Sequence, residues 1–374
     1  MQSPFRADHV GSLLRPRALL EARLHAAVSP PELKRLEDAA IIEALARQQS
    51  VGLGIFTDGE FRRAGFMSDF YESVDGLAEA GEVQRTWTGA TSGAGNASKT
   101  VVTGGAVGVA VSKIKQTKPL TSYELDFLRQ HAPGPIKVTL PSANQFPAIA
   151  YKKGVSDAAY PTYSSFLWDI VPIIAGEVRR LVAAGVRYIQ IDAPRYSYFI
   201  DPKWRQHVQQ EMGLDPEAAL DEAIRADNAC FEGVDRRGVT LAIHLCRGNN
   251  RSQWYAEGGY DLIADKLFNQ LAVDQFLLEY ESDRAGTFEP LRFVPASKAV
   301  VLGLVSSKLA ALESQDQLLR RIDEASRYVP VDRLALSPQC GFASVLEGNL
   351  LTEDDQWNKL ALVVDTARKV WPEG

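Results

Sequence analysis

Short runs of β-branched and other apolar residues alternate along this chain with longer segments in which apolar residues recur every three or four positions. The short runs are typical of buried strands, and the longer segments are typical of amphipathic helices. The predicted strands are 54–57, 136–140, 186–191, 239–245, 273–280, 299–305 and 333–337. Two further strand candidates, 8–13 and 101–111, raise the total to one more than the eight strands of a closed barrel. We interpret 101–111 as an auxiliary hairpin.

Helix boundary signals lie between most of these runs. Ser29, followed by Pro30 and Pro31, predicts a helix that stops near Gly52. Thr121 with Glu124 has the spacing of a capping box. Further helices are expected at 166–184 with a bend at Pro172, at 260–271 and at 354–371.

Repeated strand-then-helix units indicate an α/β fold with a parallel sheet, either doubly wound or closed. We favour a closed (β/α)₈ barrel of the TIM type, with residues 1–374 as one domain. The segment 71–105 is rich in glycine and small polar residues, which makes it a poor core former. We therefore expect an excursion over one end of the barrel at about 71–118.

Composition narrows the classes of partner. The chain has 45% hydrophobic residues, 24% charged residues and a net charge of −6, without a block of basic residues. This balance argues against nucleic acid and anionic membranes, and no apolar run approaches the ~18 residues of a membrane helix. Three cysteines and an N-terminus unlike a signal peptide favour a reduced, cytoplasmic protein that acts on small molecules.

Four residues that bind soft metals are predicted to end buried strands. His244 and Cys246 lie two positions apart, so they face the same side of one strand. Glu279 ends the next strand and Cys340 follows the last, and the C-terminal strand ends of a barrel build its site. These four residues are candidate Zn²⁺ ligands, with Glu281 as the alternative carboxylate. Cys230 is expected to be an ordinary buried residue.

The charge of this ligand set favours one kind of chemistry. Two thiolates, a carboxylate and a neutral histidine give Zn²⁺ a net charge of about −1, which makes it a weak Lewis acid. Such a centre can still bind a substrate thiol as a nucleophilic thiolate. Alkyl transfer to sulfur is therefore preferred over hydrolysis.

Other polar residues at strand ends suit an amino-acid substrate. Asp58, Glu60, Gln190 and Asp192 could hold the substrate. Their carboxylates suit an ammonium group, and Ser12 could hold a carboxylate. Alternatively, Asp58 and Glu60 only form a turn, and Asp192 pairs with Arg195. Lys308 and Arg62 are weaker candidates for contacts with an anion.

Taken together, the motifs resemble the catalytic half of cobalamin-independent methionine synthase and the short single-barrel proteins related to it. They are His9-Val10-Gly11-Ser12, Thr57-Asp58-Gly59-Glu60-Phe61-Arg62, Gln190-Ile191-Asp192, His244-Leu245-Cys246, Leu278-Glu279-Tyr280 and Ser337-Pro338-Gln339-Cys340-Gly341. The resemblance implies zinc ligands at His244, Cys246, Glu279 and Cys340, and homocysteine contacts at Ser12, Glu60 and Asp192. It also implies methyl transfer from a methylated folate to homocysteine, giving methionine.

Three departures from this family leave the methyl donor open. The chain has no room for the second barrel that contributes to folate binding in longer methionine synthases. It has Asp192-Ala193-Pro194 where the family has Asp-Glu-Pro, and serine in 303–308 where a proton-donating histidine is expected. The donor is therefore a methyl-folate or a methyl-corrinoid, the latter presented by a corrinoid or other methyl-donor protein.

Two alternative functions remain. An epoxyalkane:coenzyme M transferase would use the same zinc-thiolate chemistry, but a sulfonated thiol needs cationic groups where this sequence has Glu60 and Asp192. A catalytically degenerate barrel would keep the metal without turnover. A porphyrinogen decarboxylase shares the barrel type but needs no metal, and it would leave His244 and Cys246 unexplained.

Overall fold

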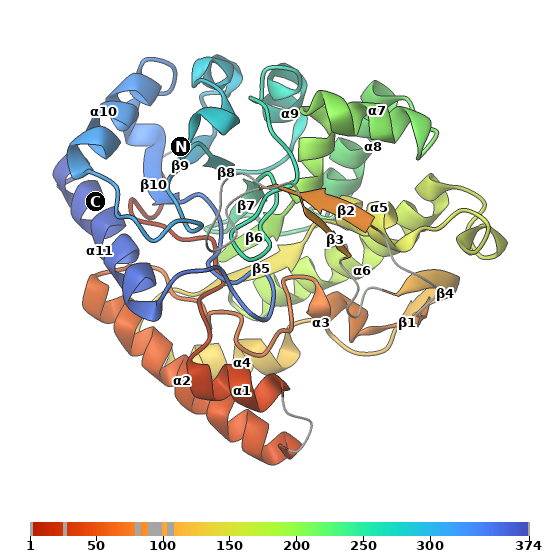
Figure 1. The fold of residues 1–374 in the computed structure, drawn as a ribbon, viewed down its shortest axis with the longest axis horizontal. Coiled ribbons are helices and arrows are strands. Elements are labelled where there is room, and N and C mark those ends of the chain that lie inside the picture. Colours follow the sequence, from red (N-terminus) through yellow and green to blue (C-terminus); the bar gives the residue numbers. More distant parts are fainter. Residues whose placement is uncertain (1–2, 25–27, 79–83, 89–98, 103–107, 373–374) are drawn as a thin grey trace.

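A parallel sheet forms the centre of the computed structural model, which describes residues 3–24, 28–78, 84–88, 99–102 and 108–372. Six neighbouring strands pair in the order β10-β9-β8-β7-β6-β5, all parallel. Helices surround these central strands (Figure 1). The strands are β5 (Lys137–Pro141), β6 (Tyr188–Asp192), β7 (Thr240–Leu245), β8 (Gln275–Glu279), β9 (Ala299–Val305) and β10 (Leu334–Pro338).

Two short segments close the sheet into a barrel. Ala7 forms a parallel bridge with Leu336 of β10, and Phe56 forms one with Ile136, next to β5. These segments supply the two remaining strand positions, so the predicted α/β TIM barrel is confirmed. The segments predicted as strands at 8–13 and 54–57 do occupy the barrel, but the first has its single bridge at Ala7, just before the predicted range, and the second has a single bridge at Phe56.

Side chains explain why these two segments do not form regular strands. The His9 N–H is donated to Asp8 Oδ1 at 2.7 Å, and the Thr57 N–H to Gln48 Oε1 at 3.0 Å. Backbone groups used in this way cannot extend a ladder of strand hydrogen bonds. Other side chains join the two segments instead: Thr57 Oγ1 donates to Gly11 O at 2.8 Å.

Helices follow the strands as the boundary signals predict, with one exception. Ser29 caps α2 and accepts the Glu32 N–H, and Gly52 ends that helix in the left-handed conformation at φ 90°. Helix α6 runs through Pro172. The helices are α1 (Arg17–Leu24), α2 (Pro30–Val51), α3 (Ser68–Tyr71), α4 (Ser122–His131), α5 (Pro147–Ala150), α6 (Tyr163–Ala183), α7 (Pro202–Gln210), α8 (Pro216–Ala229), α9 (Ala264–Gln270), α10 (Gln315–Ser326) and α11 (Glu353–Val370). Short 3₁₀ turns are η1 (Ala143–Gln145), η2 (Ser156–Ala158), η3 (Pro194–Phe199), η4 (Asp283–Ala285), η5 (Glu289–Phe293) and η6 (Val331–Arg333).

The exception is the capping box predicted at Thr121, which is wrong. The Thr121 side chain makes no capping hydrogen bond to α4 and donates instead to Glu177 Oε1 at 2.6 Å. Glu124 accepts two hydrogen bonds from Arg63, at 2.8 and 3.0 Å. Both side chains of the local motif therefore form hydrogen bonds with residues that are distant in the sequence.

The excursion consists of two antiparallel pairs outside the barrel sheet. β1 (Val74–Ala78) pairs with β4 (Val109–Gln116), and β2 (Gln84–Trp87) pairs with β3 (Lys99–Val102). The predicted hairpin at 101–111 is therefore divided between β3 and β4, and its residues 103–107 lie outside the described part.

The expectation that the excursion is too polar to contribute to the core is also wrong. Val74, Trp87 and Ala110 are buried in the main hydrophobic cluster. Thr88 forms an antiparallel bridge with Trp254, which lies in the loop after β7. The excursion thus covers the end of the barrel at which β7 finishes. Within the described residues, no helix is long and apolar enough to cross a membrane.

Charged groups lie inside the barrel as well. Lys137 on β5 and Asp8 have fully buried side chains, and the Lys137 ammonium lies 2.6 Å from Asp8 Oδ1. The ammonium also donates to Gln190 Oε1 at 3.1 Å and to the His9 carbonyl oxygen. Tyr188 donates to the other Asp8 oxygen at 2.5 Å. One cation therefore joins the first segment of the barrel to β5 and β6.

Replacing Lys137 with methionine is expected to lower the free energy of unfolding by about 3 to 5 kcal/mol, because it leaves the Asp8 carboxylate buried without its cation. Chemical denaturation of Lys137→Met measures this loss. The double variant Lys137→Met/Asp8→Asn should recover part of it. A single variant as stable as the parent protein would show that the pair does not hold the barrel together.

Candidate metal centre

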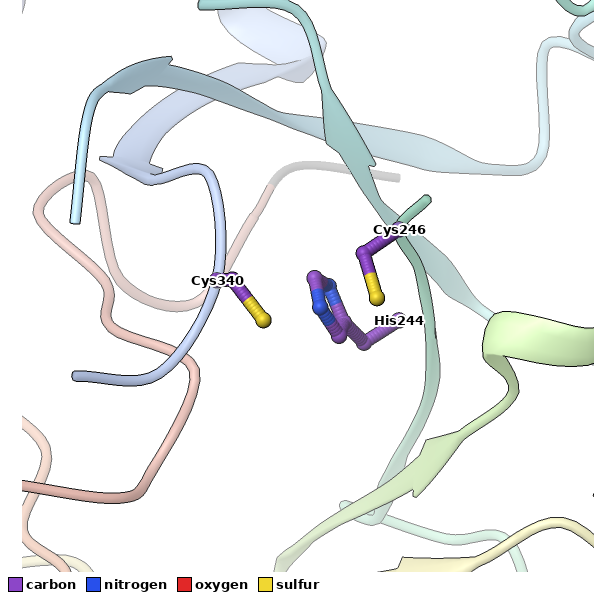
Figure 2. Close-up of side chains that lie close together, drawn as sticks. All are labelled: His244, Cys246 and Cys340. Atoms are coloured by element: carbon purple, nitrogen blue, oxygen red, sulfur yellow. The ribbon is translucent and has the colours of Figure 1, made fainter. Parts of the chain in front are cut away.

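A histidine and two cysteines meet at the C-terminal end of the barrel. His244 lies near the end of β7, and Cys246 follows that strand on the same face. Cys340 comes from the turn after β10 and faces them from the opposite side (Figure 2). One ligand atom from each residue lies within 4.8 Å of the others, and all three residues are buried.

The chemistry of this cluster fits a soft divalent metal. Neither ring nitrogen of His244 makes a hydrogen bond of good geometry within the described part of the chain, although the residue is only 3% exposed and interacts with the Cys340 thiol. Buried polar atoms are rarely left without a partner, so a ring nitrogen of His244 is available as a metal ligand. Cys246 lowers the pKa of the Cys340 thiol most strongly, and His244 and Lys308 lower it further. A thiolate is thus favoured at Cys340, and His/Cys/Cys is a set that suits Zn²⁺.

Glu279 is buried at the end of β8, beside this cluster. Its Oε1 accepts a hydrogen bond from Arg284 at 2.5 Å, and its Oε2 accepts the Arg247 N–H at 2.9 Å. Arg284 also bonds Glu281, and burial together with the Glu279 charge raises the pKa of Glu281 to about 7. The same arginine thus holds both candidate carboxylates. Glu279 is not among the three residues whose ligand atoms cluster, so its role as fourth ligand stays a prediction.

Lys308 adds a buried positive charge to this end of the barrel. The residue is 5% exposed, follows β9, and donates to the Gly248 carbonyl oxygen at 3.1 Å. Its charge lowers the pKa of the Cys340 thiol, and it also partly counteracts the rise in the pKa of the Cys246 thiol. A cation close to two thiols offsets the negative charge that a thiolate metal site accumulates.

Glu60 and Asp192 form a second group of negative charge. Burial raises the pKa of Glu60 to about 7, against the effect of Arg63, and the Asp192 charge raises it further. Burial likewise raises the pKa of Asp192 to about 6, and nearby His244 opposes this shift. Arg63 lies 3.8 Å from Glu60 but is held closer by Asp69 and Glu124, at 2.7 and 2.8 Å. Among the described residues, Glu60 therefore has only the longer ion pair with Arg63, which it shares with two other carboxylates, and Asp192 has no ion pair.

Gln190 and Ser12 connect this second group to the metal cluster. Gln190 Nε2 donates to Asp192 Oδ1 at 2.8 Å and to the Val10 carbonyl oxygen at 2.7 Å. A Cβ atom on Gly341, next to Cys340, would lie 2.0 Å from Ser12 Oγ. Ser12 is therefore packed against the turn that carries Cys340, and only glycine leaves room for its hydroxyl.

The other residues considered as site candidates have contacts outside the metal cluster. Asp58 Oδ1 accepts the Glu60 N–H at 2.8 Å, which supports the turn interpretation for Asp58. Arg62 pairs with Glu37 and Asp38, so its charge is already balanced. Cys230 is buried and donates weakly to Ala226 O, as expected of an ordinary core cysteine. The alternative pairing of Asp192 with Arg195 does not form, because no guanidinium nitrogen of Arg195 has a hydrogen-bond partner among the described residues.

Arg284 and Arg63 are site residues that sequence reasoning missed. Arg284 lies in the 3₁₀ turn η4 and Arg63 in the turn after Glu60, so neither belongs to a periodic element. The only available signal was an arginine three to five residues from a candidate carboxylate, which is common on protein surfaces.

Comparison with known proteins identifies the family. The family model described as "Cobalamin-independent synthase, Catalytic domain" matches residues 14–369, nearly the whole chain. The chain belongs to the cobalamin-independent methionine synthase catalytic-domain family. The family resemblance predicted from the sequence motifs is therefore confirmed, and the buried His244, Cys246 and Cys340 cluster is consistent with the metal site of this family.

Individual relatives of the family cover almost the same length. An uncharacterized Bacillus subtilis protein, YxjH, is 38% identical over 99% of this chain and 96% of its own. A methionine synthase from Pyrococcus abyssi is 25% identical over 97% of this chain and 92% of its own. A crystal structure from Listeria monocytogenes, of a protein proposed to be a vitamin-B12-independent methionine synthase, superposes with a TM-score of 0.73 at 28% identity and covers 99% of both chains.

A solved structure of a B12-independent methionine synthase from a Shewanella species, in complex with selenomethionine, has a TM-score of 0.74. It is 21% identical to this chain and covers 98% of each, so it supports the barrel fold.

Variants of the three clustered residues should separate metal binding from folding. His244→Ala and Cys340→Ser are each expected to lose most bound zinc while keeping the far-ultraviolet circular dichroism of the barrel, because the cluster lies at the functional end and not in the packed core. Metal analysis of the purified variants measures the loss, and Cys230→Ser is the matched control. Stoichiometric zinc in both ligand variants would contradict this assignment.

Proposed function

We propose that this protein is a zinc-dependent methyltransferase whose acceptor is a thiol-bearing amino acid, with homocysteine first among acceptors and methionine as the product. The observation that carries the proposal is the adjacency of two groups: the buried His244, Cys246 and Cys340 cluster, and the carboxylates of Glu60 and Asp192. Cys340 and His244 both act on the Asp192 pKa, so the two groups lie close enough to bind the two ends of one small molecule.

Each end of that molecule has a partner of the right chemistry. The ammonium group would lie between Glu60 and Asp192, where Glu60 has only the longer, shared ion pair with Arg63 and Asp192 has no ion pair among the described residues. The carboxylate would be held by the Ser12 hydroxyl and the nearby backbone. The thiol would reach the metal cluster, completed by Glu279 as a fourth ligand. Zinc bound there would lower the pKa of the substrate thiol and hold it as a thiolate.

The remaining chemistry belongs to the methyl donor. A sulfur–carbon bond forms as the bond between the methyl group and its carrier breaks, and a folate carrier would then need a proton on the departing nitrogen. Lys308 is a buried cation beside the cluster, in the segment where the family's histidine is expected. We propose that its positive charge offsets the negative charge of the site during this step. The donor is a methyl-folate or a methyl-corrinoid.

Zinc-edge X-ray absorption of the purified protein, with and without homocysteine, tests the proposal. We expect one zinc per chain, and a gain of one sulfur neighbour when homocysteine is added. A turnover assay with methyl-folate and methyl-corrinoid donors then identifies the carrier. A zinc shell that ignores homocysteine would exclude thiol activation, and thiol binding without turnover on either donor would favour a catalytically degenerate barrel.

The acceptor site should also be sensitive to pH. Because the pKa of Glu60 is raised from 4.5 to about 7, its carboxylate becomes neutral as the pH falls through that value and no longer attracts an ammonium group. The affinity for methionine, which has no thiol to titrate, should therefore fall by up to about tenfold for each pH unit below 7. Calorimetric titrations between pH 5.5 and 8 measure this dependence.

Glu60→Gln is the matched variant for this experiment. It should bind methionine weakly at every pH and lose the pH dependence near pH 7, so that only the dependence from Asp192, whose pKa is raised to about 6, remains at lower pH. A variant with the pH profile of the parent protein would assign the dependence to another group.

A further inference from the structure

Arg195 is a buried cation without a hydrogen bond or ion pair to any of the described residues. It is the second residue of η3, three positions after Asp192, and it is 2% exposed. Within the described part of the chain, none of its three guanidinium nitrogens has a hydrogen-bond partner. Its guanidinium lies over the ring of Tyr198 at 4.5 Å and farther from Tyr255 at 5.7 Å.

This isolation is physically unfavourable. The guanidinium group stays charged at all ordinary pH values, and its donors form a planar fork that matches a carboxylate. Stacking on aromatic rings does not satisfy those donors. Other buried arginines in this chain are paired: Arg63 lies against Asp69 and Glu124, and Arg247 donates to the Gly258 and Ala285 carbonyl oxygens.

Arg195 lines a pocket between η3, α7 and α8. The walls are mostly apolar, and Leu167, Val208, Met212 and Leu214 are among the lining residues. The lining also includes the Glu222 carboxylate, which is already bonded by Ser164 and by the Trp168 indole at 3.2 Å. The pocket thus offers one free cationic fork in an apolar setting.

The pocket lies near the metal centre. Tyr255, whose ring lies by Arg195, donates its N–H to the Arg247 carbonyl oxygen at 3.1 Å. Arg247 directly follows Cys246. The Arg195 pocket is therefore a neighbour of the candidate site and separate from the Glu60 and Asp192 group.

We propose that Arg195 forms a binding site for the carboxylate of a small organic acid, whose apolar part lies against the walls of this pocket. A single fork matches one monoanionic carboxylate, and the four apolar residues named above suit a short hydrocarbon chain. A phosphate dianion would bring a second negative charge that one guanidinium group does not balance. The site is independent of the proposed methyl transfer.

Ligand-observed NMR titrations of the whole zinc-loaded protein test this site, with butyrate as the probe, neutral butyramide as its matched control and inorganic phosphate as the competing anion. We expect butyrate to bind and butyramide not to bind. Arg195→Met should weaken butyrate binding at least tenfold, and Arg195→Lys should be intermediate because it keeps the charge but loses the fork. Arg237→Met, at a fully exposed ion pair, should change nothing.

A second variant keeps the test decisive if Arg195→Met fails to fold. Glu222→Gln removes the only carboxylate among the described lining residues, so it should strengthen butyrate binding. Equal binding of butyrate and butyramide, preferential binding of phosphate, or butyrate binding that is weakened in Glu222→Gln would each overturn the proposal.

Discussion

The buried ammonium group of Lys137 is the interaction on which the rest of the structure depends. The barrel closes at two segments that have almost no ladder of backbone hydrogen bonds, so side chains must hold the closure. Lys137 joins Asp8 and the His9 carbonyl oxygen of one segment to Gln190 on β6. Gln190 in turn bonds Asp192 at the functional end. The same polar chain that closes the barrel therefore positions a carboxylate of the candidate site.

The metal cluster could be predicted because every step towards it rests on regular geometry. Alternation along a strand puts His244 and Cys246 on one face, and parallel strands put their C-terminal ends at one end of a barrel. Cys340 follows another such strand, so topology alone brings it near the first two. Glu279 satisfies the same rules, yet its oxygens bond Arg284 and the Arg247 N–H. Arg284 lies in a 3₁₀ turn, where no periodic rule predicts which carboxylate an arginine will reach.

Long-range contacts explain why two predictions from the sequence are wrong. Thr121 and Glu124 have the spacing of a capping box, but they form hydrogen bonds with Glu177 and Arg63, which lie in distant parts of the chain. The excursion has the composition of an exposed loop, but Trp87 is 4% exposed and packs against Tyr255 with ring centroids 5.2 Å apart. Local spacing and average composition describe what a segment can do alone. Long-range partners decide what it does in the fold.

The distribution of charge around the cluster restricts the substrate more sharply than the cluster itself. Lys308 and Arg284 lie near the thiols and Glu279, where they offset negative charge. Glu60 and Asp192 lie on the Gly11 and Val10 side, where Arg63 is engaged elsewhere. A thiol with a sulfonate at its far end would place a second anion against two carboxylates in a buried site, where water screens the repulsion only weakly. An ammonium group at that end would instead place a cation between Glu60 and Asp192. Under the proposed function the same metal cluster could activate either thiol, so the carboxylates, and not the metal ligands, would select an amino acid.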